Sequence, residues 1–143
     1  MDDIIALYSD KILSFANKCE DINLSHYNAY SKKRAPICGS TVEVFLNIEN
    51  DIIVDYGHRI RACALGKASA YLIFQNLKGT SINEIPYIQS RLHDMFKFDG
   101  PIPLEINNYH YLEPAKPFKN RHASILLSID AISSAINSFK TDN

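Results

Sequence analysis

Residues 41–61, which read TVEVFLNIENDIIVDYGHRIR, decide the fold of this chain. Apolar residues recur at every second position from Val42 to Ile48, a period that is typical of a half-buried β-strand. Residues 49–51 are polar and typical of a tight turn. The alternation then returns, ending near Arg61, at Ile52, Val54 and Tyr56. The stretch therefore predicts two strands joined as a β-hairpin.

Upstream of the hairpin, apolar residues spaced three and four apart predict an amphipathic helix over residues 4–17. Residues 20–37 are polar and aromatic with little periodicity. We expect a loop there, with a short edge strand over residues 26–30.

Downstream of the hairpin, the period becomes helical at Cys63, and Gly79 is a natural place for that helix to end. Ser81 and Glu84 have the spacing of a capping box for a second helix, whose apolar residues continue over 87–98. A proline-rich loop over 99–119 and a last helix over 120–139 follow.

Strands and helices are thus segregated along the chain rather than alternating. This order predicts an α+β fold, with a small antiparallel β-sheet and helices packed on one face. A chain of 143 residues fits a single domain over residues 1–143.

Composition excludes several classes of function. A net charge of −1 implies no general attraction to nucleic acid or to an anionic membrane. A membrane span needs about 20 apolar residues, and no segment comes near that length. The acidic first residues lack the pattern of a secretory signal, so we expect a cytoplasmic protein. No phosphate-binding or hydrolase motif is present, and we do not expect an enzyme.

The chain has three cysteines, Cys19, Cys38 and Cys63. An odd, small number without a secretory signal argues against a disulfide framework. One interpretation is that all three are buried apolar residues. Cys19, which Glu20 and Asp21 follow, fits that structural role.

Cys38 has features of a reactive thiol. It lies in a loop between Pro36, which stiffens the chain, and Gly39, which permits a turn. The basic residues 32–34 just upstream favour the thiolate over the thiol.

Cys63 is expected in the first turn of a helix, directly after a strand. Unpaired backbone N–H groups and the helix dipole favour a negative charge there. Because a hairpin returns the chain to its starting end, Cys38 and Cys63 are expected at the same end of the sheet. Two thiolates supply half of a site for a soft metal. His122, at the start of the last helix, is the first candidate for a further ligand, although a lone histidine is more often a surface or capping residue.

These segments resemble a known family. Residues 35–40 (APICGS), the hairpin and residues 62–70 (ACALGKASA) are similar to the cluster-binding segments of the IscU, SufU and NifU N-terminal scaffolds. The likeness is strong over residues 35–75 and extends to the first helix and to residues 122–132.

The resemblance implies a scaffold or carrier on which iron and sulfide are assembled into a [2Fe–2S] cluster. It would receive sulfur from a cysteine desulfurase and pass iron or the cluster to apo iron–sulfur acceptor proteins, and it could also bind zinc. Cys38 and Cys63 carry over as ligands, and His122 matches a family histidine in one of two alignments.

The chain departs from the family pattern in three places, two of them in the site. Ser40 replaces an aspartate. The third cysteine, a main sulfur acceptor in the family, is replaced by Ala123 in one alignment and by Ser124 in the other. The family's chaperone-binding stretch survives only as residues 113–119 (EPAKPFK).

Two alternatives remain. Residues 37–42 (ICGSTV) also resemble the loop of SufE-type sulfur acceptors, in which Cys38 would carry a persulfide and stimulate a desulfurase. The chain could also be a module that binds the desulfurase without metal or sulfur.

Overall fold

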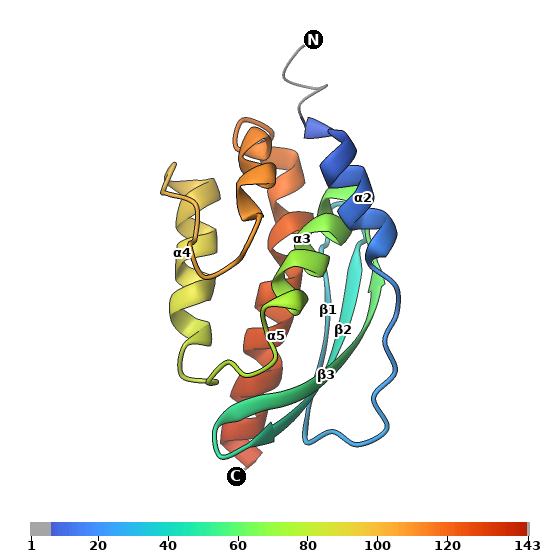
Figure 1. The fold of residues 1–143 in the computed structure, drawn as a ribbon, viewed down its shortest axis with the longest axis vertical. Helices are drawn as coiled ribbons and strands as arrows, with labels where there is room; N and C mark the ends of the chain where they lie inside the picture. The colour runs from blue at the N-terminus through green and yellow to red at the C-terminus, as the bar shows by residue number, and fades with distance from the viewer. Residues whose placement is uncertain (1–6, 143) are drawn as a thin grey trace.

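The computed structural model describes residues 7–142 (Figure 1). Ile4 and Ile5 of the predicted first helix lie outside the described residues. The described part has three strands, four α-helices and two short 3-10 helices. In chain order these are α2 (Asp10–Lys18), β1 (Ala29–Arg34), β2 (Thr41–Glu49), β3 (Ile52–Arg61), α3 (Ala64–Gln75), α4 (Ile85–Lys97), η1 (Tyr109–Ala115), η2 (Lys119–Arg121) and α5 (His122–Asp142).

The strands form one antiparallel sheet in the order β1-β2-β3. The predicted hairpin is confirmed as β2 and β3. Its turn places Asn50 and Asp51 at φ values of 52° and 63°. Asparagine and aspartate tolerate this left-handed conformation, which two-residue hairpin turns require.

The buried face of β3 changes part-way along the strand. The pairing shifts between Asn47 and Ile48, so Ile53 is fully buried near the turn. Beyond the shift, His58 and Ile60 are buried instead. The alternation that begins at Ile52 therefore predicts the strand correctly, but not which of its residues face the core near the turn.

Strand β1 lies further along the chain than the expected edge strand at residues 26–30. Among its residues only Ala29 is buried, and Lys32, Lys33 and Arg34 are exposed. The second half of this edge strand is basic and shows no alternation of apolar residues. The sequence pattern therefore did not predict the position of β1.

The helix boundaries follow local capping. Ser9 caps α2, its Oγ accepting a hydrogen bond from the Ile12 N–H at 3.3 Å, so α2 begins at Asp10 and the predicted helix is not continuous through Ser9. The predicted capping box at Ser81 is wrong. The Ser81 hydroxyl accepts from the Asn83 N–H within a turn, and α4 begins only at Ile85 with Pro86 in its first turn.

The helices cover one face of the sheet, as predicted (Figure 1). Helix α5 packs on β1 and β2, α3 packs beside α5, α2 lies on α3, and α4 lies on the other side of α5. The core between these layers includes Val42, Val44, Leu46, Leu65, Leu72, Ile125, Ile129 and Ile132. Within residues 7–142, no helix combines the length and apolar character needed to cross a bilayer.

Candidate functional site

The hairpin brings Cys38 and Cys63 to one end of the sheet, as predicted. Thr41 pairs with Arg61 across the two strands, and the cysteines lie just before and just after this pair. Both line one open pocket of about 390 Å³. The other residues lining the pocket are Gly39, Ser40, Arg61, Ala62, Asn120, Arg121 and Ser124.

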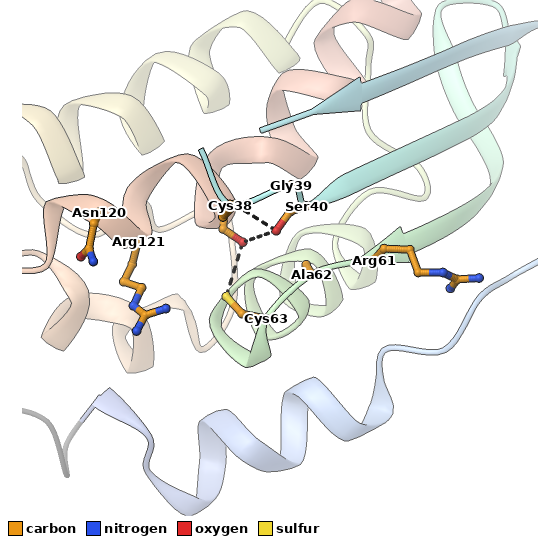
Figure 2. Close-up of a pocket in the computed structure, with 9 residues that line it drawn as sticks. Cys38, Gly39, Ser40, Arg61, Ala62, Cys63, Asn120 and Arg121 are labelled. Carbon is orange, nitrogen blue, oxygen red and sulfur yellow. Dashed lines mark hydrogen bonds between the residues drawn. The ribbon is translucent and has the colours of Figure 1, made fainter. Parts of the chain in front are cut away.

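Two serine hydroxyls link the two thiols (Figure 2). Cys38 Sγ lies 3.2 Å from Ser40 Oγ, and Ser40 Oγ lies 3.2 Å from Ser124 Oγ. Ser124 Oγ in turn lies 3.5 Å from Cys63 Sγ. Both serines are buried, whereas Cys38 is exposed and Cys63 is half-buried. The two sulfur atoms therefore border a shared polar patch and do not point into the apolar core.

The pKa of the Cys38 thiol is lowered, chiefly because the Ser40 hydroxyl, which accepts from the protonated thiol, can turn and donate a hydrogen bond to the thiolate. The Ser40 backbone N–H adds to this effect, and burial opposes it. The lowered pKa agrees with the sequence prediction, but its cause differs. The basic residues 32–34 are not among the causes, and their side chains lie in a different groove.

Cys63 is the N-cap residue of α3, with an extended backbone and no capping hydrogen bond from its side chain. Its sulfur is thus free to face Ser124. Close packing of α3 on α5 holds Ser124 there. A Cβ atom built on Gly66 would lie 2.4 Å from Ser124 Oγ and 3.2 Å from the Ser124 carbonyl oxygen. Only glycine fits at this crossing without a shift of one helix.

The structure does not bring His122 to the two cysteines. Its ring is buried against Phe96, and its Nε2 lies 2.9 Å from the Ala115 carbonyl oxygen. His122 and Ala123 both line the neighbouring groove, while Ser124 lines the cysteine pocket. Of the two positions that the alignments offer for the third cysteine, only Ser124 lies in the cysteine pocket.

Asn120 and Arg121 line the pocket but escaped the sequence reasoning. The helical repeat of the predicted helix over 120–139 could have identified them. In a helix, residues three and four apart lie on the same face, so positions 120 and 121 share a face with Ser124, whereas His122 lies on the opposite face. Arg61 also lines the pocket, but its side chain extends away from the thiols (Figure 2). Its Nη1 lies 3.5 Å from Asp21 Oδ2.

The remaining candidates lie elsewhere. Burial raises the pKa of Cys19 to about 11, in keeping with its predicted structural role. His93, for which the sequence suggested no partner, has its Nε2 2.7 Å from Asp130 Oδ1. Across residues 7–142, no three His, Cys, Asp or Glu side chains cluster in a way that could hold a metal ion. Two thiols and two hydroxyls are therefore what this site offers.

Comparison with known structures places the chain in a family. It is 33% identical to the N-terminal part of a nitrogen-fixing NifU-like protein from Brucella abortus, with a TM-score of 0.94 and 99% of each chain covered. This chain belongs to the NifU-like N-terminal family.

A second match shows the same fold at lower identity. It is a putative iron–sulfur cluster assembly scaffold protein for the SUF system from Fervidobacterium islandicum AW-1. Identity is 17%, the TM-score is 0.82, and 91% of this chain and 96% of that chain are covered. No protein-family model matches the sequence, and no curated protein matches it either. The family and the α+β fold predicted from the sequence are confirmed.

Proposed function

We propose that this NifU-like chain is an iron–sulfur cluster assembly scaffold or carrier that binds iron or a [2Fe–2S] cluster through Cys38 and Cys63. The observation that carries the proposal is the placement of both thiols in one open pocket, linked through Ser40 and Ser124. Thiolates are the preferred protein ligands of iron–sulfur clusters. The role is one of binding and transfer and requires no catalysis.

The cysteines enter coordination as thiolates, so binding releases their protons. Cys38 is prepared for this step because Ser40 lowers the pKa of its thiol. The helix N-terminus at Cys63 favours the negative charge of a bound thiolate. Both residues therefore support a soft, anionic ligand pair.

The cluster is cargo, and the site suits cargo that must leave. A [2Fe–2S] cluster usually takes four thiolates, and this pocket supplies two. Ser124 adds a hydroxyl to the pocket, and His122 faces away from it. The remaining coordination positions are left to a partner protein or a small thiol. We expect the cluster to be held weakly and passed to apo iron–sulfur acceptor proteins, with a cysteine desulfurase as the sulfur source.

A sulfur-relay role is the second candidate, and one observation favours it. Cys38 is exposed, its pKa is lowered, and the preceding Ile37 is 91% exposed, so the loop is accessible to another protein. The Cys38 thiolate would attack the outer sulfur of a desulfurase persulfide. A persulfide would form on Cys38, and the desulfurase cysteine would leave as a thiolate. Cys63 has no part in this reaction.

Reconstitution without oxygen separates the two roles. Protein incubated with iron, sulfide and a reductant is expected to develop the visible absorbance of a cluster. Cys38→Ala and Cys63→Ala are each expected to abolish it. Cys19→Ala is the matched control, since Cys19 lies outside the pocket. If Cys63→Ala reconstitutes fully, the scaffold role is wrong. A mass gain of about 32 Da on Cys38, after incubation with a desulfurase and cysteine, would then favour the relay.

A further inference from the structure

A second groove lies beside the Cys38 loop, between β1 and α4. Its volume is about 600 Å³. Helix α5 forms the floor with Ala123, Leu126 and Leu127, and the end of β1 forms one wall. His93 and Lys97 of α4 form the opposite wall. The chain leaves this groove through Ala35 and Pro36 and reaches Cys38 directly.

The groove is strongly basic. Lys32, Lys33 and Arg34 line it from β1, and Lys97 lines it from α4. Within residues 7–142, none of these four side chains has an ion pair or hydrogen-bond partner. The single carboxylate in the groove, Asp130, is already engaged.

Two contacts occupy Asp130. Its Oδ1 lies 2.7 Å from His93 Nε2 and accepts a hydrogen bond from Gln89 Nε2 at 2.9 Å. The pleat of β1 turns Lys33 toward α5, as it does Ser31, whose Oγ donates to the Ala131 carbonyl oxygen, and it turns Lys32 and Arg34 to the other face of the sheet. Four formal positive charges along this edge are therefore set against one carboxylate that is bound to α4. Charge complementarity requires the missing negative charges to come from a ligand.

The sheet is open on the same side. Strand β1 pairs with β2 alone, so within the described part of the chain its outer edge has no partner strand. The opposite edge is covered, because β3 forms bridges to Ile22 and Ser81. An open edge is a template for an added strand.

Edge protection alone explains part of this arrangement. Lysines on an edge strand discourage pairing between copies of a protein. Protection of the edge does not require Lys97, a further cation that comes from α4. It also does not require the apolar residues of α5 that lie between the two walls. The exposed side chain of Ile37 follows Pro36, which lines the groove, and precedes Cys38.

We propose that this groove binds an extended, acidic segment of a partner protein, which adds to the open edge of β1. Its carboxylates pair with the basic residues of β1 and with Lys97, and its apolar side chains lie over the α5 floor and Ile37. A partner held there has its remaining surface beside Cys38. The groove would thus select which proteins reach the cysteine pocket, whatever that pocket carries.

Fluorescence anisotropy tests this proposal on the metal-free full chain. The probe is a fluorescein-labelled ten-residue peptide in which Glu and Asp alternate with Val and Leu. We expect binding at low salt that weakens as salt is added. Lys32→Glu with Lys33→Glu is expected to weaken binding about tenfold or more. The matched control, Lys11→Glu with Lys78→Glu, changes two exposed lysines outside the groove and is expected to bind as wild type does.

Three results would overturn the proposal. The first is the absence of binding, and the second is equal weakening by both double variants. The third is equal or tighter binding of a single-stranded DNA oligonucleotide of the same charge, which would mean a general anion site. Amide chemical-shift changes in the wild-type protein give an independent check, since they must fall on β1 and α4. Because no cluster is present, failure here leaves the cluster proposal intact.

Discussion

Replacing Gly66 by alanine tests how the crossing of α3 and α5 positions Ser124. In an exposed helix this change gains about 1 kcal/mol. Here the new Cβ would lie 2.4 Å from Ser124 Oγ, 2.9 Å from Ala62 Cβ and 3.2 Å from the Ser124 carbonyl oxygen. The hydroxyl can rotate away, but the other two atoms move only with their backbones.

The steric term decides the sign. Overpacking of this kind costs about 1–3 kcal/mol. Rotating the buried Ser124 hydroxyl also breaks its contacts with Ser40 and Cys63, at about 1 kcal/mol for each lost hydrogen bond. After the gain in helix propensity, Gly66→Ala should lower the free energy of unfolding by about 2–4 kcal/mol.

Urea unfolding measures this change through the transition midpoint at constant slope. The double variant Gly66→Ala with Ser124→Ala is the control. It removes the 2.4 Å contact, so Gly66→Ala should cost less in the Ser124→Ala background than in wild type. If Gly66→Ala is as stable as wild type or more so, the close approach of the two helices is not as described.

Three further predictions concern Ser40, Ser124 and His58. Ser40→Ala should raise the pKa of Cys38 and move its iodoacetamide reaction to higher pH, and an unmoved profile would contradict the role of Ser40. Ser124→Cys should lengthen the half-life of a reconstituted cluster against a chelator, since a third thiol would replace the hydroxyl whose oxygen lies 3.5 Å from Cys63 Sγ. An unchanged half-life would place position 124 outside the coordination sphere. Burial lowers the pKa of His58 from 6.5 to about 4, so the unfolded chain binds the extra proton in that range and stability should fall as pH drops through it. His58→Phe should flatten this part of the pH dependence, measured by urea unfolding, and an unchanged slope would assign it to other groups.

The sequence predicts the parts of the fold that alternate or repeat clearly. The apolar alternation from Val42 to Ile48 identifies the hairpin, and the hairpin alone brings Cys38 and Cys63 together. Strand β1 was misplaced because its position is fixed by pairing with β2, and only Ala29 of its residues is buried. Local pattern does not contain that pairing.

The site residues were predicted only in part, because side-chain directions also depend on packing between elements far apart in the chain. Chemical type suggested His122 as a ligand, because imidazole binds metals and a serine hydroxyl rarely does. The direction of each side chain on α5 depends on how the helix lies against α3. In that packing, which includes a close approach at Gly66, Ser124 faces Cys63 and His122 lies against Phe96.

Analysis of iron and acid-labile sulfide in protein purified without oxygen tests the cluster role most directly. The wild-type chain is expected to contain iron and sulfide in equal amounts, and Cys19→Ala is expected to contain as much of each as the wild type does. The double variant Cys38→Ala with Cys63→Ala is expected to retain neither. Equal iron and sulfide in the double variant, or none in the wild type when freshly reconstituted, would contradict a cluster held by these two thiols.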